Sequence, residues 1–191
     1  MRLIAGRFGG RRFQPPAKLP ARPTTDRARE GLFNVLAHSL DLETISFLDL
    51  FGGTGAVTYE MASRSEGARI VTVEQDAKLV AFIKKNVAML GVEKQVSVLR
   101  MDVAQYIKSS TDSFDFILAD PPYALPWLYQ LPDLITAGNL LKPDGLLAVE
   151  HDHRNQFRDH PLFFRERNYG DAIFSFFAKN IVQNSNRGDL S

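Results

Sequence analysis

Short apolar runs alternate with segments of helical periodicity from residue 45 to residue 151. The apolar runs have strand length and are rich in β-branched and aromatic residues, so they predict strands. The predicted strands are 45–51, 68–74, 95–102, 114–119 and 145–151, the last one after a KPDG turn. The segments between them carry apolar residues every three or four positions and predict helices at 56–64, 76–90, 104–109 and 125–138. Pro126 and Pro132 are expected to start or break the last helix.

Strands that are apolar along their whole length and are joined by helices are typical of a parallel sheet covered on both faces. Residues 162–180 depart from this pattern and predict two strands joined around Tyr169-Gly170-Asp171. We therefore expect an α/β fold: a mostly parallel, seven-stranded sheet with helices on both faces and an antiparallel C-terminal hairpin.

The first 40 residues differ from this body. Apolar residues flank Gly9-Gly10 in RLIAGRFGGRRF, which predicts a small N-terminal β-hairpin with a glycine turn. The proline-rich stretch 15–23 predicts an extended connector, and Thr24-Thr25-Asp26 offers N-cap oxygens for a helix over 26–38. The expected organisation is a hairpin and connector at 1–23, one domain at 24–180 and a polar, disordered tail at 181–191.

Charge is distributed unevenly along a chain whose formal net charge is only +1. Residues 1–30 carry eight arginine and lysine side chains against two carboxylates, and the rest of the chain is mildly acidic. A basic arm indicates a polyanionic partner, although a solvated basic tail has the same composition. Folding as a hairpin favours the first interpretation, because a hairpin presents a fixed surface to phosphates.

Composition narrows the class of protein further. No window of the 191 residues approaches the roughly 18 apolar positions needed to cross a bilayer, and the N-terminus has no apolar signal region. The chain has no cysteine, which excludes disulfides, thiolate nucleophiles and cysteine-based zinc sites. We expect a cytoplasmic protein with no membrane partner, and a monomer is the default expectation.

Ligands of parallel α/β sheets bind beyond the carboxyl ends of the strands, so the residues after each predicted strand form the candidate site. Gly53 and Gly55 lie where the first strand turns into a helix, so that a ligand can approach the backbone and helix amides can donate to it. The same spacing also fits a purely structural turn. Thr58 stands where the dinucleotide fingerprint has its third glycine, which disfavours a hydride-transfer enzyme.

Acidic residues follow the next two strands. Glu74 lies 21 residues after Gly53, close to the offset of about 20 at which a carboxylate reaches ribose hydroxyls. It is favoured over Asp76 because it ends the V-T-V-E alternation directly. Asp102 either accepts from an adenine amino group or caps the following helix, and one residue can do both.

The fourth strand ends in Asp120-Pro121-Pro122-Tyr123. Two prolines hold the chain extended and remove two amide donors, which leaves the Asp120 carboxylate and the Pro121 carbonyl as an acceptor-only rim. Tyr123 adds a flat ring. Acceptors beside a stacking ring suit the exocyclic amino group of a planar base, whereas a rigid proline turn with an incidental tyrosine is the structural alternative.

Other residues with reactive or aromatic side chains are weaker candidates for a functional site. Glu150-His151-Asp152-His153 has the residue types of a metal site, but no third ligand cluster accompanies it. We interpret its histidines as surface residues and expect no metal. Trp127 and Tyr129 either line the pocket of the base or pack their helix, and packing is the default expectation.

Four motifs in order make the chain resemble the class I S-adenosylmethionine-dependent methyltransferases, which have a Rossmann-like fold: DLFGGTG at 49–55, Glu74, Asp102 and DPPY at 120–123. RLIAGRFGGRRF, RPTTDRAREGLFNVL and RNYGDAIFSFF resemble the RsmD family within that class. These bacterial enzymes methylate the N2 amino group of one guanine in small-subunit (16S) ribosomal RNA. Gly52 and Thr54 depart from the family pattern, where alanine and serine are commoner.

The resemblance implies S-adenosyl-L-methionine as the cofactor and ribosomal RNA, or the assembling small subunit, as the partner. The catalytic residues that it implies are Asp120, Pro121, Pro122 and Tyr123. The cofactor-binding residues that it implies are Asp49, Phe51, Gly53, Gly55, Glu74, Asp102, Val103 and Asp120, with Thr25 and Arg27 near the methionine end. The arginines that it implies in RNA binding are Arg7, Arg11, Arg12, Arg22 and Arg29.

Two alternatives stay open from the sequence. An enzyme of the same class acting on adenine N6 in DNA or on a protein glutamine would keep the cofactor, although such enzymes more often have asparagine in place of Asp120. A non-catalytic RNA-binding assembly protein would keep the fold and bind no cofactor.

Overall fold

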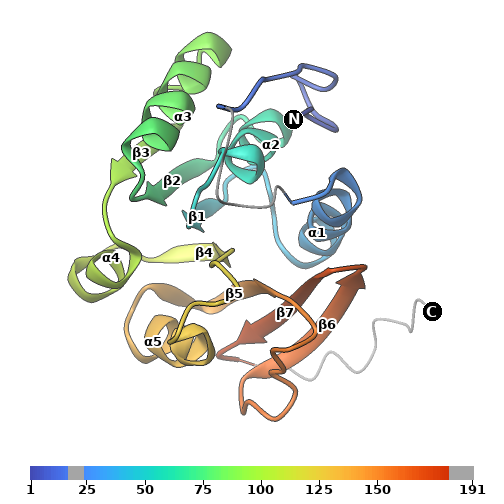
Figure 1. Cartoon of the computed structure of the whole chain (residues 1–191), viewed down its shortest axis with the longest axis vertical. Coiled ribbons are helices and arrows are strands. Elements are labelled where there is room, and N and C mark those ends of the chain that lie inside the picture. Colours follow the sequence, from blue (N-terminus) through green and yellow to red (C-terminus); the bar gives the residue numbers. More distant parts are fainter. Residues whose placement is uncertain (17–23, 181–191) are drawn as a thin grey trace.

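The structure is a computed structural model that describes residues 1–16 and 24–180 (Figure 1). A seven-stranded sheet in the order β3-β2-β1-β4-β5-β7-β6 forms its centre. Strands β1 to β5 are parallel, and β7 runs antiparallel between β5 and β6. The strands are β1 (Ser46–Leu50), β2 (Arg69–Glu74), β3 (Val96–Arg100), β4 (Phe114–Ala119), β5 (Leu141–His151), β6 (Phe163–Tyr169) and β7 (Ala172–Ala178). The expected mostly parallel sheet with its antiparallel C-terminal hairpin is confirmed.

Helices cover both faces of the sheet, with α1, α2 and α3 on one side and α4 and α5 on the other (Figure 1). Neighbouring strand residues point to opposite faces, so Phe47 joins one core with α1 and α2 while Leu48 joins the other with α4 and α5. Both faces of the sheet are therefore shielded from solvent, which explains why the strands are apolar along their whole length. The helices are α1 (Asp26–Ser39), α2 (Ala56–Arg64), α3 (Ala77–Leu90), α4 (Val103–Ser109), the 3₁₀ turn η1 (Leu128–Gln130) and α5 (Leu131–Ala137).

The KPDG segment was expected as a turn before a strand, but it lies inside β5. Leu141 pairs with Phe114 and Leu146 pairs with Phe116, so the residues between Leu141 and Leu146 bulge out of the register. A Cβ on Gly145 would lie 3.0 Å from the Phe114 carbonyl oxygen, so glycine permits this close approach. Because β5 pairs with β4 both before and after the bulge, the KPDG segment is part of the strand and not a separate turn.

The helix expected at 125–138 consists of two short pieces, η1 and α5. Pro132 occupies the first turn of α5, where its missing amide hydrogen has no partner to lose. The expected break at a proline is confirmed.

Residues 1–16 form a loop whose two arms pair as in a hairpin, with an antiparallel bridge between Arg2 and Arg12 and backbone hydrogen bonds that join Met1 to Phe13 and Leu3 to Arg11. The expected hairpin pairing is present, but it is limited to one bridge and does not extend into two strands. Leu3 and Phe13 from this loop are buried in the core that covers α2. The backbone between them bonds both to itself and to α2: the Gly10 amide donates to the Leu3 carbonyl, and the amides of Ile4 and Ala5 donate to Glu60. The basic arm is thus held on the domain surface.

Some expectations fall on other parts of the chain. The proline-rich connector beyond residue 16, Arg22 and the tail at 181–191 lie outside the described residues. Within the described residues, no helix combines the length and apolar character that a membrane span requires.

Candidate active site

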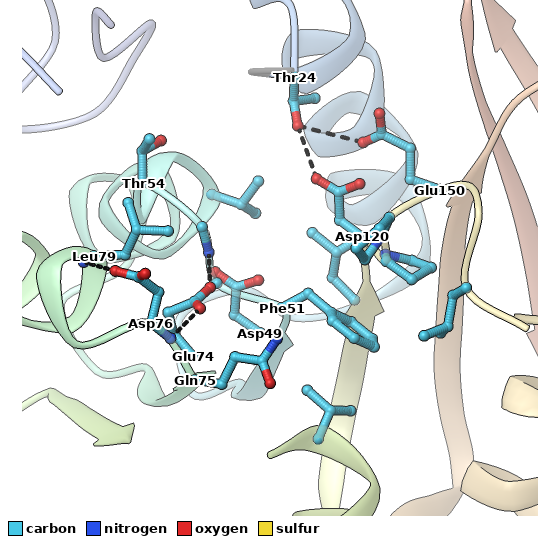
Figure 2. Close-up of a pocket in the computed structure, with 18 of the residues that line it drawn as sticks. Thr24, Asp49, Phe51, Thr54, Glu74, Gln75, Asp76, Leu79, Asp120 and Glu150 are labelled. Atoms are coloured by element: carbon cyan, nitrogen blue, oxygen red, sulfur yellow. Dashed lines mark hydrogen bonds between the residues drawn. The ribbon is translucent and has the colours of Figure 1, made fainter. Parts of the chain in front are cut away.

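A cavity of about 810 Å³ opens beyond the carboxyl ends of the parallel strands. It is lined at one end by the turn after β1 and the end of β2, and at the other by residues 120–125 after β4 and the end of β5. Figure 2 shows the two ends facing one another, with Glu74 in one and Asp120 in the other. The structure therefore brings the predicted strand-end residues into one concave space.

The turn after β1 has an unusual backbone. Phe51 has a φ of 64° and Gly53 a φ of 54°, in the left-handed region that a non-glycine residue rarely adopts. The Gly52 amide donates to the Val73 carbonyl, and a Cβ at Gly52 would lie 2.3 Å from the Thr72 methyl group. Glycine at position 52, a departure from the family pattern, is therefore matched to Thr72 on β2. Strain at such a turn is typical of a functional site.

Gly55 has a different place from Gly53. It is the N-cap of α2 with a φ of 76°, and a Cβ there would meet the ring of Tyr59. Gly53 lines the cavity, whereas Gly55 is not among its lining residues. Its role in this structure is to start the helix.

Glu74 at the end of β2 is held by two backbone amides. Gly53 donates to Oε2 at 2.9 Å and Asp76 donates to Oε1 at 2.8 Å (Figure 2). The Asp76 carboxylate instead caps α3 by accepting from Lys78 and Leu79, and these amides, Leu79 first, lower its pKa. Of the two candidates, Glu74 is the one that fastens the glycine turn.

Asp49 lies on β1 below this turn and is buried. Thr58 donates to it at 2.5 Å and in turn accepts from Thr72. Burial raises the pKa of Asp49 to about 7, with smaller contributions in the same direction from the charges of Asp120 and Glu74. The cavity is therefore lined by one buried carboxyl group, that of Asp49, whose pKa lies near neutrality.

Asp102 and Val103 lie after β3 and also line the cavity. The Asp102 side chain accepts from the Gln105 amide at 3.1 Å and so caps α4, as the sequence allowed. Its remaining acceptor capacity is available to a ligand. Val103 is buried and presents an apolar wall.

Asp120 meets a second carboxylate, Glu150 at the end of β5. The Thr24 hydroxyl lies 3.3 Å from Oδ2 of Asp120 and 3.3 Å from Oε2 of Glu150 (Figure 2). Burial, followed by the negative charge of Glu150, holds the pKa of Asp120 well above its usual range. Two carboxyl groups from neighbouring strands therefore converge here, and Glu150 adds acceptors to the rim that was predicted from Asp120 and Pro121.

Tyr123 is half-buried, and its hydroxyl donates to Oε1 of Glu150 at 3.2 Å. Burial and the Glu150 charge raise the pKa of this phenol. Trp127 also lines the cavity, with its ring 6.2 Å from that of Phe51, so it is part of the pocket rather than of the helix packing alone. Apolar ring faces thus lie beside the two carboxylates.

Two cofactor expectations near the start of α1 fit the structure poorly. Thr25 accepts from the Ala28 amide and caps α1, and it is Thr24 that lines the cavity. Arg27 is exposed and close enough to Tyr169 for its charge to affect that phenol. Neither Thr25 nor Arg27 is among the described residues that line the cavity.

Arg29 was expected to contact RNA, and this expectation was wrong because its side chain is 1% exposed. Its guanidinium donates to Asp26 and to the Arg2 carbonyl, and Nε lies 3.7 Å from Glu60. Arg29 therefore ties α1 to the N-terminal loop and α2. A buried arginine held in this way cannot reach a phosphate without breaking these contacts.

The arginines of the N-terminal loop differ in accessibility. Arg7 donates to the Ala62 carbonyl and to Gln95, so its guanidinium is engaged by the protein. Arg11 and Arg12 are exposed, and Arg11 lies over the ring of Phe8. Of the arginines in this loop that were expected to bind RNA, these two are therefore the accessible ones.

The histidines of the EHDH run lie in different environments. His151 is fully buried and pairs with Ser175, so the expectation that it is a surface residue was wrong. His153 is exposed and contacts the Gly170 carbonyl. Within residues 1–16 and 24–180, no group of three or more histidine, cysteine or acidic side chains is arranged to hold a metal ion.

Sequence reasoning missed two residues of the site, Thr24 and Glu150. Glu150 is the last residue but one of the predicted strand 145–151, so the rule that pointed to Glu74 and Asp120 extends to it. Thr24 had no comparable signal, because 96 residues separate it from Asp120 and only the fold brings them together.

The family model described as "Conserved hypothetical protein 95" matches residues 1–178. The Ribosomal RNA small subunit methyltransferase D of Haemophilus influenzae is 30% identical over 169 residues, which cover 87% of this chain and 83% of that protein. The protein of the same name from Escherichia coli strain K12 is 28% identical over 183 residues, covering 94% and 90%.

Comparison with solved structures supports the same family and fold. A hypothetical protein of Thermus thermophilus matches with a TM-score of 0.80 at 30% identity, covering 93% of this chain and 99% of that one. An RNA methyltransferase of Salinibacter ruber, solved with S-adenosyl-L-homocysteine, matches with a TM-score of 0.64 at 18% identity and shares the fold over 85% and 97% of the chains. The chain belongs to the Conserved hypothetical protein 95 family, the RsmD family of methyltransferases with a class I fold, as its sequence motifs predicted.

Proposed function

We propose that this protein transfers a methyl group from S-adenosyl-L-methionine to the exocyclic N2 of a guanine in small-subunit ribosomal RNA. The observation that carries the proposal is the cavity itself: the Asp120 carboxylate and the residues after it share one space with the Gly53 turn and Glu74. One end offers acceptors to an amino-bearing base, and the other offers a carboxylate to a ribose. The relatives named rRNA methyltransferases support this substrate class.

The residues at the Glu74 end fit the cofactor. A carboxylate accepts hydrogen bonds only, which suits ribose hydroxyls, and the Gly53 and Asp76 amides fix its orientation. Asp102 keeps acceptor capacity for an adenine amino group. The described lining residues include six carboxylates and no lysine, arginine or histidine, which favours a ligand with a positive charge. S-adenosyl-L-methionine, when bound, supplies a methyl group that is already activated on a positively charged sulfur.

The residues at the Asp120 end fit the base. The guanine N2 lone pair is delocalised into the ring, so the amino group is a poor nucleophile. Acceptance of N2–H hydrogen bonds by the Asp120 carboxylate and the Pro121 carbonyl draws the nitrogen toward tetrahedral geometry and exposes its lone pair. Tyr123 provides the ring face against which the base stacks. Orientation and exclusion of water are then the main contributions of the protein.

A guanine must leave its stack to enter the cavity, which costs a few kcal/mol. Phosphate contacts of Arg11 and Arg12 on the docked N-terminal loop offset this cost. We place this reaction in the cytoplasm, where ribosomal RNA and assembling subunits are found.

The test is mass-spectrometric mapping of modified nucleotides in ribosomal RNA from cells with and without the protein. The expected result is one N2-methylguanine that is present in cells with the protein and absent from cells without it. Adding the purified protein and the cofactor to unmodified RNA, either naked or in subunits, should restore this methylation. Label transferred from the cofactor only to DNA or only to protein would assign the enzyme to another substrate class. Undetectable cofactor binding would instead support the non-catalytic alternative.

A further inference from the structure

Two arginines, Arg27 and Arg167, lie beside the ring of Tyr169, outside the cavity. Tyr169 ends β6 and packs against α1 at Gly31, where a Cβ would clash with the ring. Arg27 lies four residues before Gly31 on the same face of α1, and Arg167 lies two residues before Tyr169 on the same face of β6. The packing of α1 against β6 therefore brings the two arginines together.

The phenol of Tyr169 is close to both charges. Burial raises its pKa, and the charges of Arg167 and Arg27 oppose this rise. Arg27 is exposed and Arg167 is half-buried, so both side chains are accessible from solvent. Two guanidinium groups from different elements thus face the same region of the surface.

This region lies at the edge of the sheet where the cavity opens. β6 runs in the same direction as β5, because β7 is antiparallel to both. The end of β6 is therefore at the carboxyl edge, roughly 10 Å from the end of β5 by the spacing of strands. The start of α1 is at the same edge, since Thr24, two residues before Asp26, lines the cavity. The arginine pair is thus close to the base end of the cavity without lining it.

Other arginines of this part of the fold are neutralised by carboxylates. Arg29 on α1 pairs with Asp26, and Arg158 pairs with Glu166 on β6. The ion pairs among the described residues include neither Arg27 nor Arg167, and the guanidinium of Arg167 donates to the carbonyl of Glu166. An accessible pair of cationic groups at the edge of a cavity attracts an anionic ligand.

Cationic side chains also lie on the other side of α1. Arg12 forms a backbone bridge with Arg2, and Arg2 forms an ion pair with Asp26 in the first turn of the helix. Figure 1 shows α1 between the N-terminal loop and the hairpin of β6 and β7. The loop and the arginine pair therefore flank the start of α1, where Thr24 reaches the cavity. A nucleic-acid strand that crosses this opening would meet basic residues on both sides.

We propose that Arg27 and Arg167 bind the RNA backbone next to the target guanine, on the side of α1 opposite to the N-terminal loop. A guanidinium group donates two parallel N–H hydrogen bonds to a phosphate, and two such groups can hold one phosphate or two successive ones. This inference rests on the proposed function and adds to it the path of the strand beside the cavity. Arg27 then contacts RNA and not the methionine end of the cofactor, which the family resemblance implied.

The first test compares the full-length wild type with Arg27→Gln, Arg167→Gln and the double variant. Binding of a short unmodified RNA that contains the mapped guanine is followed by fluorescence anisotropy between about 50 and 200 mM salt. Each substitution should lower the slope of log K against log salt by roughly 0.7–0.9, and the double variant by about twice as much. A double variant with the slope of the wild type would overturn the proposal.

The second test locates the contact on the RNA. A neutral methylphosphonate replaces one phosphate at a time on either side of the guanine. At a phosphate held by the two arginines, this change should weaken binding by the wild type about 10-fold and binding by the double variant less than about twofold. If every replacement costs the double variant as much as the wild type, the arginines hold none of these phosphates and the proposal is refuted.

Arg158→Gln is the matched control. It also removes one positive charge, but Arg158 is paired with Glu166, which points to the opposite face of β6 from Arg167. We expect this variant to keep the slope of the wild type. The variant Arg27→Lys/Arg167→Lys keeps both charges and should recover the slope, which a merely structural defect would not allow.

Cofactor binding and turnover separate this inference from the alternatives. The double glutamine variant should bind S-adenosyl-L-homocysteine within about threefold of the wild type and keep kcat within about twofold at saturating RNA, so that the loss is in KM. A fall in cofactor affinity with unchanged RNA binding would return Arg27 to the cofactor site and overturn the inference. If the wild type methylates no guanine in RNA, the proposed function fails. If guanine is methylated but RNA binding ignores the two arginines, only this inference fails.

Discussion

The Gly53 amide donates to the Glu74 carboxylate at 2.9 Å, so the end of β2 fastens the glycine turn that follows β1. The bond joins residues 21 apart in the sequence and fixes one carboxylate oxygen, while the Asp76 amide fixes the other. Glu74 therefore presents its remaining lone pairs to the cavity in a set direction. A preorganised acceptor loses little entropy when it binds a ribose.

We predict that Glu74→Ala weakens binding of S-adenosyl-L-homocysteine by about 10- to 100-fold, since hydrogen bonds to a charged group contribute roughly 1.5–3 kcal/mol. Isothermal titration calorimetry measures this directly. Glu93→Ala, at an exposed position outside the cavity, is the control and should bind as the wild type does. Equal affinities for the two variants would remove Glu74 from the cofactor site.

We predict that Asp120→Ala abolishes turnover and leaves cofactor affinity within about threefold of the wild type. The carboxylate lies at the base end of the cavity, whereas the proposed cofactor contacts lie at the Glu74 end. Single-turnover methyl transfer and calorimetry separate the two effects. Near-normal turnover would contradict the role given to this carboxylate.

Much of this fold follows from periodicity, because strands buried on both faces must be apolar along their length. The helix 56–64 and the strand 114–119 match the structure residue for residue. The strand-end rule also located Glu74 and Asp120, since carboxyl ends of parallel strands share one edge.

The rest depended on long-range contacts that no local pattern records. In the sequence Arg29 cannot be told apart from the other basic residues of the arm. In the structure its side chain is buried, and it contacts Glu60 and the Arg2 carbonyl. Thr24 and Glu150 meet across 126 residues. Glu60 on α2 accepts from the amides of Ile4 and Ala5 in the N-terminal loop, a contact that joins residues more than 50 positions apart.

Burial of Arg29 predicts a structural phenotype. Arg29→Ala leaves Glu60 with Arg64 as its remaining cationic partner, so we expect a loss of about 3 kcal/mol in the free energy of unfolding. Arg27→Ala on the exposed side of the same helix should change it by less than about 0.5 kcal/mol. Equal effects of the two substitutions, measured by urea unfolding, would contradict the buried ion pair.

Arg11 and Arg12 should act on RNA instead. We predict that the double variant Arg11→Glu/Arg12→Glu weakens RNA binding and lowers the slope of log K against log salt by roughly 2, one for each phosphate that the variant no longer neutralises. Lys108→Glu on α4, across the sheet from the loop, should leave the slope unchanged. A salt dependence in the double variant that matches the wild type would remove the loop from the RNA-binding surface.

Asp49 predicts how stability changes with pH. Its pKa is raised to about 7 by burial, whereas in the unfolded chain it titrates near 4. Between these values the folded protein holds a proton that the unfolded chain has released, so the unfolding free energy falls as pH rises, by ~4 kcal/mol at most. Asn at position 49 keeps an acceptor for Thr58 and cannot titrate. The stability of Asp49→Asn relative to the wild type should therefore increase from pH 4 to pH 7 and then level off, whereas exposed Asp159→Asn should show no such trend. A difference that stays constant across this range would show that Asp49 is ionised in the folded protein.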